Sequence, residues 1–257
     1  MSTCLQRFFL SVLLFAFAGL PARPASLTIA AAADLASAER DLSNSFKKAH
    51  PKDSVRFVFG ASGALRQQIA NGAPYDVFLS ANAGYIDRLA SSRKILPDTA
   101  IVYAHGRLAM LWRDHKPHDI NDLTQDWVRF VAVANPKLAP YGLAAQQSLE
   151  HVGLWARLRP KIVFGENVRQ TLEMFDSGNA DVVLTAYSLI VKRPGVQPIP
   201  EDWRQPILQK AGVVAASRQV ALARKFLAFL QSPAGAGILT AHGLTPVRAH
   251  SKESLDE

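Results

Sequence analysis

The chain has 257 residues, of which 49% are hydrophobic, 19% are charged and 9% are aromatic. This balance supplies enough apolar material for a packed core and excludes disordered, collagen-like and coiled-coil chains. The net charge is +8, but the basic residues form scattered pairs without aromatic neighbours, so nucleic-acid binding is not expected.

The first 25 residues are typical of a secretory signal peptide. An arginine precedes the apolar run 8–20, and small residues follow it, with Ala22 and Ala25 as alternative cleavage sites. The run is too short to span a membrane, which takes about 20 apolar residues. Removal of residues 1–25 also removes Cys4, the only cysteine, and lowers the net charge to +6. We therefore expect an exported chain without disulfides.

Strand and helix patterns alternate through the next part of the chain. The apolar run 27–33 is followed by Asp34 in the position of a helix N-cap, with apolar residues at helical spacing after it. Two further strand–turn–helix units follow before Pro97 ends the segment. Strands are expected at 27–33, 55–59 and 76–80, and helices after Asp34, after Gly63 and at 83–90.

Two long apolar stretches separate this part from a second one with the same alternation. The stretch 99–113 would carry the chain into a second lobe, and the stretch 208–216 would carry it back. We therefore expect an α/β fold of two lobes, each a mixed, mostly parallel sheet flanked by helices. Lobe 1 would comprise 26–103 and 214–257, and lobe 2 would comprise 104–213. The remaining strands are expected at 130–134, 161–164 and 181–185, and the remaining helices at 143–152, 166–176, 220–230 and 234–241.

Small polar and aromatic residues stand where the predicted strands end. In sheets of this kind ligands bind beyond the carboxyl ends of the strands, where helices begin. A helix N-terminus offers unpaired N–H groups and about half a positive charge, so several of them together favour an anion without any arginine or lysine. The candidate ligand-binding residues are Asp34, Ser62, Tyr141, Val168 and Tyr187.

Each of these residues also has a purely structural interpretation. Asp34 and Ser62 are suitable helix N-caps, and Tyr141 and Tyr187 are suitable half-buried aromatic residues. Only their expected convergence on one cleft favours a binding site.

Catalytic and metal sites have weaker support in the sequence. The alternative function is a secreted serine hydrolase or transferase with Ser62 as nucleophile and a distant base such as His105, although 60–64 does not match the Gly-x-Ser-x-Gly turn. His115 and His118 have the spacing of metal ligands, but Pro117 places them in a loop. No bare metal cation and no catalytic residue are therefore expected.

Several segments together resemble the periplasmic molybdate-binding proteins of ABC importers. No single segment is diagnostic, but their order after a signal peptide is specific, and the resemblance runs from about Leu27 to Val247. The segments are Ala30–Leu35, Phe59–Leu65, Asn71–Ala81, Asn135–Gly142, Gly165–Val168 and Gly243–Val247.

This resemblance implies a two-lobed type II periplasmic-binding fold that closes on molybdate or tungstate and delivers it to a membrane permease. It further implies a periplasmic monomer that has no enzymatic activity and no cofactor, with molybdenum held as an oxyanion through residues such as Ser62 and Val168. The choice between molybdate and tungstate stays open, and so does weaker binding of sulfate or phosphate.

The resemblance also assigns roles to individual residues. The first serine of the family falls on Asp34, the second on Ser62, and backbone donors fall on Tyr141 and Val168. A tyrosine of some members falls on Ala186, beside Tyr187, so either Tyr141 or Tyr187 is expected to supply that hydroxyl.

Asp34 departs from the family pattern in its charge. An ionised carboxylate about 4 Å from the ligand would cost on the order of 4 kcal/mol per unit of ligand charge at an effective dielectric constant near 20. We therefore expect the side chain to turn away and cap its own helix, so that only a backbone N–H binds.

Overall fold

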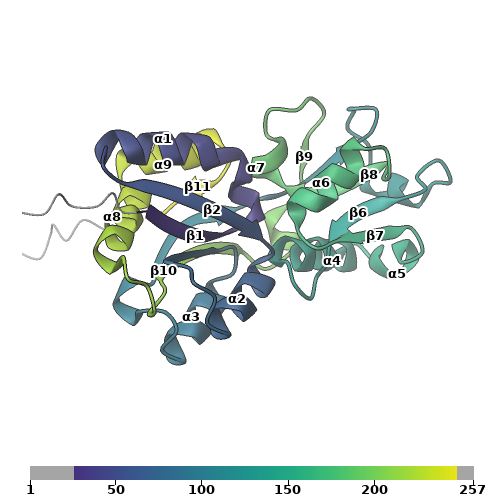
Figure 1. The fold of residues 1–257 in the computed structure, drawn as a ribbon. Coiled ribbons are helices and arrows are strands. Elements are labelled where there is room, and N and C mark those ends of the chain that lie inside the picture. Colours follow the sequence, from purple (N-terminus) through teal and green to yellow (C-terminus); the bar gives the residue numbers. More distant parts are fainter. Residues whose placement is uncertain (1–25, 248–257) are drawn as a thin grey trace, which may run out of the picture.

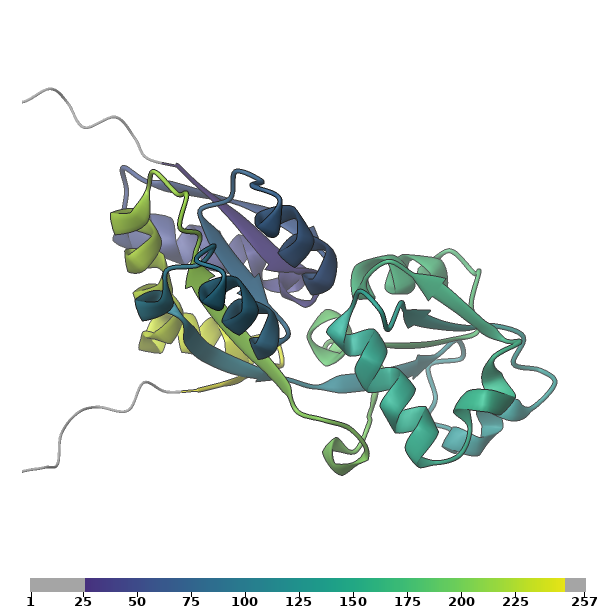
Figure 2. The same ribbon diagram turned by 90° about the horizontal axis from the view of Figure 1, so that it is seen from below.

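The computed structural model describes residues 26–247, so the predicted signal peptide at 1–25 and the segment 248–257 lie outside the described residues. The described chain forms two lobes, each built on its own sheet (Figures 1 and 2). The strand order is β11-β4-β10-β3-β1-β2 in lobe 1 and β7-β6-β8-β5-β9 in lobe 2.

Lobe 1 is built from the two ends of the described chain. Its parallel strands are β1, β2 and β3, and β10 pairs antiparallel with both β3 and β4. Its elements are β1 (Ser26–Ala32), η1 (Ala33–Ala38), α1 (Glu39–Ala49), β2 (Ser54–Gly60), α2 (Ser62–Ala70), β3 (Val77–Ser80), α3 (Ala83–Ser91), η2 (Pro97–Thr99), β4 (Ile101–Gly106), β10 (Ile207–Val213), α8 (Val220–Gln231), α9 (Pro233–Ala241) and β11 (Thr245–Pro246).

Lobe 2 is built from one continuous segment. Its parallel strands are β6, β7 and β8, and β5 pairs antiparallel with β8 and β9. Its elements are β5 (Leu108–Trp112), η3 (Ile120–Thr124), β6 (Val131–Ala134), α4 (Pro140–His151), α5 (Trp155–Leu158), β7 (Ile162–Gly165), α6 (Val168–Asp176), β8 (Val182–Ala186), α7 (Tyr187–Ile190), β9 (Gln197–Pro198) and η4 (Glu201–Trp203).

Helices cover both faces of each sheet, and each face has its own core. In lobe 1 the helices α1, α8 and α9 lie on one face and α2 and α3 on the other (Figure 1). Helix α1 follows the expected pattern: Leu42 and Phe46 are buried, acidic residues occupy its first turn and two lysines its last, which suits the helix dipole. The sequence-based prediction of two mixed sheets flanked by helices is confirmed.

The chain crosses between the lobes at two places. It leaves lobe 1 at Arg107, between β4 and β5, and returns through 199–206, between β9 and β10. The predicted boundaries at 103 and 213 therefore need correction, because β4 continues to Gly106 and β10 also belongs to the sheet of lobe 1. An apolar strand sequence does not indicate which sheet will accept its hydrogen bonds. Within residues 26–247, no helix has both the length and the hydropathy needed to cross a membrane.

Candidate functional site

A small cavity lies between the lobes where four helices begin. The residues around it come from the starts of η1, α2, α4 and α6, together with Ala81 at the end of β3. Its volume is about 10 Å³, far below the range of about 300–1,000 Å³ found for pockets that hold larger organic ligands. The lining residues are Ala32, Ala33, Asp34, Gly60, Ala61, Ser62, Ala81, Ala139, Pro140, Tyr141, Asn167 and Val168.

Lobe 1 contributes a buried hydroxyl group at the start of α2. Ser62 is the first residue of this helix and is 1% exposed. Its Oγ accepts a hydrogen bond from the N–H of Ala81 at 3.0 Å, which leaves the hydroxyl hydrogen free to be donated. The structural alternative, in which Ser62 is an N-cap, is wrong, because the N-cap position falls on Ala61, which makes no side-chain hydrogen bond.

Lobe 2 contributes the first N–H groups of α6. The side chain of Asn167 caps this helix and accepts hydrogen bonds from the N–H groups of Arg169 and Gln170, at 3.0 and 3.1 Å. Val168 is the first helical residue, so its N–H has no acceptor within the helix. The carbonyl of Val168 accepts from Thr171 and Thr185 at 2.8 and 3.1 Å, which holds this turn of backbone in place beside the cavity.

The side chain of Asp34 turns away from its own helix, but it does not cap it. The helix begins at Ala33, with Ala32 as an N-cap that makes no side-chain hydrogen bond. The Oδ2 atom of Asp34 instead accepts hydrogen bonds from the Tyr141 hydroxyl at 2.9 Å and from Gln209 Nε2 at 2.5 Å. The predicted capping role is therefore wrong, because two distant donors compete successfully for the carboxylate.

These groups form a buried polar network where the two lobes meet the crossing strands. The Tyr103 hydroxyl of β4 donates to Gln209 Oε1 at 3.0 Å, and Gln209 in turn donates to Asp34. Burial raises the pKa of Asp34 to about 7, although the hydrogen bonds from Tyr141, Gln209 and its own N–H lower it. Burial also raises the pKa of Tyr103 and Tyr141 well above the usual range, so both hydroxyls stay protonated.

Sequence reasoning missed Gln209 and Tyr103. One signal was present, since Gln209 interrupts an otherwise apolar strand and is fully buried there. A buried amide in such a strand needs a polar partner, but the sequence does not say which one.

Tyr187 does not line the cavity. It begins α7, and its ring lies against Arg107, whose guanidinium carbon is 4.0 Å from the ring centroid. Its N–H donates to the carbonyl of Arg107 at 2.9 Å. The structure therefore brings Asp34, Ser62, Tyr141 and Val168 together and leaves Tyr187 at the crossing between the lobes.

The cavity carries no lysine, arginine or histidine among its lining residues. It is therefore neutral apart from Asp34, and its donors are backbone N–H groups and hydroxyls. Ser62 has no histidine beside it in this cavity, so the hydrolase alternative lacks the base that it requires. Within residues 26–247, no group of three or more histidine or acidic side chains is arranged to hold a metal ion.

The lobes touch each other around the cavity. The N–H of Gly63 donates to the carbonyl of Leu138 across the cleft at 2.9 Å. On the other side, the Ser188 hydroxyl of α7 donates to the carbonyl of Asp34 at 2.7 Å, and the Ser37 hydroxyl donates to the carbonyl of Ser188 at 2.9 Å. These contacts describe a closed arrangement of the two lobes.

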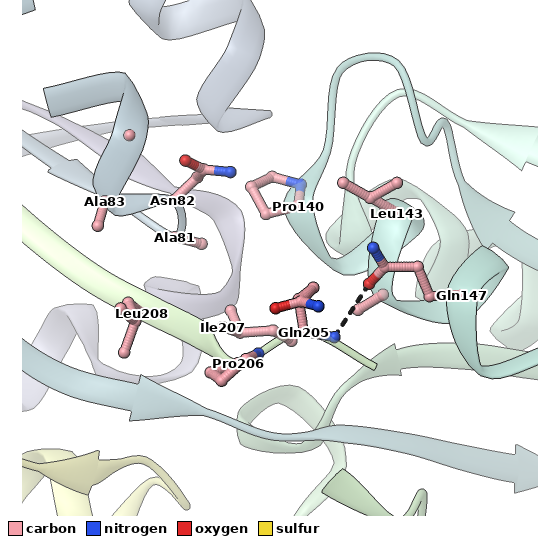
Figure 3. Close-up of a pocket in the computed structure, with 12 residues that line it drawn as sticks. Ala81, Asn82, Ala83, Pro140, Leu143, Gln147, Gln205, Pro206, Ile207 and Leu208 are labelled. Atoms are coloured by element: carbon pink, nitrogen blue, oxygen red, sulfur yellow. Dashed lines mark hydrogen bonds between the residues drawn. The ribbon is translucent and has the colours of Figure 1, made fainter. Parts of the chain in front are cut away.

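A larger pocket of about 200 Å³ adjoins the cavity and shares Ala81 and Pro140 with it. Its walls are mainly apolar and come from both lobes and from the start of β10. Figure 3 shows Gln147 on one wall, where its Oε1 accepts a hydrogen bond from the N–H of Gln205 at 3.2 Å. This pocket has no charged lining residue, so it provides neutral surroundings for the smaller cavity.

Comparison with known proteins agrees with this architecture. The family of bacterial extracellular solute-binding proteins matches residues 27–245. The chain belongs to this family. This solute-binding protein is 32% identical over 231 residues to the molybdate-binding protein ModA of Rhodobacter capsulatus, covering 87% of this chain and 90% of that protein.

Solved structures give the same result. The periplasmic molybdate-binding protein of Azotobacter vinelandii is 31% identical, with a TM-score of 0.80 and coverage of 85% of this chain and 98% of that one. The substrate-binding domain of a putative molybdenum ABC transporter from Clostridium difficile is 32% identical, with a TM-score of 0.66 and coverage of 87% and 100%. The fold is thus the two-lobed type II periplasmic-binding fold, and family membership implies solute binding outside the cytoplasm.

Proposed function

We propose that this solute-binding protein captures a tetrahedral oxyanion, molybdate or tungstate, in the cavity between its lobes. The observation that carries the proposal is the convergence of four helix starts on one small space without a basic side chain. Such a site stabilises a dianion through oriented N–H groups and hydroxyls rather than through opposite charge. The names of the relatives, which are molybdate-binding proteins, support the same ligand.

The individual roles follow from the hydrogen-bonding partners already in place. Ser62 donates its hydroxyl hydrogen to the anion, and Val168 donates its N–H from the start of α6. Tyr141 contributes a backbone N–H, because its hydroxyl is already bonded to Asp34. Asp34 contributes backbone from the start of η1, and Tyr187 takes no part in this scheme.

Anion capture of this kind suits a transport role outside the cytoplasm. The protein is a periplasmic monomer, exported by the signal peptide at 1–25, that delivers its anion to the permease of an ABC transporter. It performs no reaction and uses no cofactor, and its preference for molybdate or tungstate over sulfate arises from the size of the cavity.

Titration with anions tests the proposal. A ligand that binds only the native state stabilises it by about 2.7 kcal/mol at a hundredfold excess over Kd, so molybdate and tungstate should raise the melting temperature clearly. Sulfate and phosphate at the same concentrations serve as controls and should act far less. Equal shifts with all four anions would contradict selection by size, and no shift with any of them would overturn oxyanion binding.

A further inference from the structure

Only one of the two carboxylate oxygens of Asp34 accepts hydrogen bonds from other residues. Oδ2 accepts from both Tyr141 and Gln209. Oδ1 is buried and has no partner among the described residues. Asp34 itself is fully buried and lines the cavity. An unpaired buried polar atom is costly, so this oxygen needs a partner that the chain does not supply.

This asymmetry is the hydrogen-bonding pattern of a neutral carboxylic acid. Such an acid has one carbonyl oxygen, which only accepts, and one hydroxyl oxygen, which also donates. Oδ2 behaves as the carbonyl oxygen because it receives two donors. The proton then belongs on Oδ1, where it requires an acceptor. An oxygen atom of the bound anion would provide that acceptor, whereas an ionised Oδ1 would repel the anion.

We propose that Asp34 binds the oxyanion as a neutral acid and thereby couples anion binding to the uptake of one proton. This inference rests on the proposed function and adds a donor to the same site. The proton comes from solvent and attaches to Oδ1 as the dianion enters. No bond within the anion forms or breaks, and the bound pair carries two negative charges instead of three.

Among the ionisable side chains of this buried network, Asp34 is the one whose charge changes near neutral pH. Tyr103 from β4 and Tyr141 from α4 face it, and both keep their protons because burial raises their pKa. Arg204, before β10, lies near Tyr141 and lowers the pKa of that hydroxyl. Burial raises the pKa of Asp34 itself to about 7.

The elements that pack against η1 also carry ionisable side chains. On α1, Asp41 pairs with His242 at 2.9 Å. Arg169 and Glu173 of α6 are exposed and pair with each other at 3.1 Å, and Arg56 of β2 donates to Thr28 at 3.1 Å. Tyr187 of α7 lies under Arg107. None of these groups contributes to the pKa shift of Asp34, so its titration is set by burial and by the hydrogen bonds described above.

The inference predicts a specific pH profile for molybdate binding. Below about pH 7 the acid already carries its proton, so Kd should be nearly constant. Above about pH 7 each pH unit should weaken binding about tenfold, because a proton must first be taken up. Isothermal titration of the full mature chain with molybdate at about pH 8, in buffers of different ionisation enthalpy, should show uptake of close to one proton per anion, falling toward zero at about pH 6.

The isosteric substitution Asp34→Asn is the matched variant. Its amide retains a donor but does not titrate, so it should bind molybdate with a Kd that is nearly independent of pH and without proton uptake. The proton count in the wild-type protein needs no variant, so it decides the question even if Asp34→Asn fails to fold.

Failure of this inference is distinguishable from failure of the proposed function. Molybdate binding by the wild-type protein without proton uptake, and with one Kd from about pH 6 to about pH 9, would overturn the role of Asp34 and leave oxyanion capture intact. The same pH dependence in Asp34→Asn as in the wild type would also overturn it. Absence of binding by both proteins at every pH would overturn both proposals.

Discussion

Substitution of Gly63 by alanine should weaken anion binding by blocking closure of the lobes. Gly63 lies in the first turn of α2, and its N–H donates to the carbonyl of Leu138 in lobe 2 at 2.9 Å. A Cβ atom at this position would lie 2.6 Å from that carbonyl oxygen. The oxygen belongs to backbone, so it has little freedom to move aside.

The expected size of the effect combines two contributions. Loss of the hydrogen bond costs about 0.5–1.5 kcal/mol, and the steric conflict costs about 1–3 kcal/mol. Together they amount to about 1.5–4.5 kcal/mol, or roughly a ten- to thousandfold increase in Kd. The unliganded protein should keep its stability, because lobes that stand apart avoid the contact and alanine is favoured over glycine in a helix by up to about 1 kcal/mol.

Calorimetric titration with molybdate, together with thermal unfolding in the absence of ligand, measures both quantities. The matched control is Gly237→Ala in α9, where an added Cβ meets no atom within 4 Å. Gly63→Ala should bind far more weakly than Gly237→Ala while the two variants unfold at similar temperatures. A Kd within about twofold of the control would refute the reasoning, because the cleft would then close without the Gly63–Leu138 contact.

Three further predictions concern the residues of the site. Ser62→Ala should raise Kd roughly ten- to a hundredfold, the value of a hydrogen bond to a charged ligand of about 1.5–3 kcal/mol, and an unchanged Kd in the same titration would remove Ser62 from the site. Tyr187→Phe should leave Kd unchanged, because this ring packs on Arg107 outside the cavity, and a clear loss of affinity would return its hydroxyl to the ligand. Without ligand, the free energy of unfolding of Asp34→Asn relative to that of the wild type should grow from about pH 4 to about pH 7 and then level off. The reason is that the unfolded wild-type chain releases this proton near pH 4, whereas the buried group keeps it until about pH 7. Denaturant unfolding of both proteins across this range measures the difference, and a constant difference would contradict a raised pKa of Asp34.

The sequence predicted those parts of the fold that depend on neighbouring residues. Strand–turn–helix alternation placed the long helices to within about three residues, whereas the short helices α5 and α7 were not expected. The helix α6 begins after the Asn167 cap, two residues later than expected. The places of Ser62 and Val168 also followed from a general rule, because each begins a helix beyond the carboxyl end of a parallel strand, where ligands bind in sheets of this kind.

The rest depended on contacts between residues far apart in the chain. Asp34 matched the local pattern of an N-cap, yet its partners are Tyr141 and Gln209, which lie 107 and 175 positions away. The position of β10 was equally hidden, because its apolar residues suit either sheet. Tyr187 was expected at the ligand on the basis of its neighbour in sequence, but the start of α7 directs its ring toward Arg107.

The position of β10 between β3 and β4 affects the order in which the chain becomes structured. Lobe 2 uses one uninterrupted segment, whereas the sheet of lobe 1 stays divided until residues 207–213 are available, and Lys210 pairs with Ser80 across about 130 residues. Contacts of such long sequence separation form slowly. In a chain that emerges from its N-terminus, lobe 2 should therefore fold first, and a chain ending before β10 would carry a finished second lobe beside an incomplete first one.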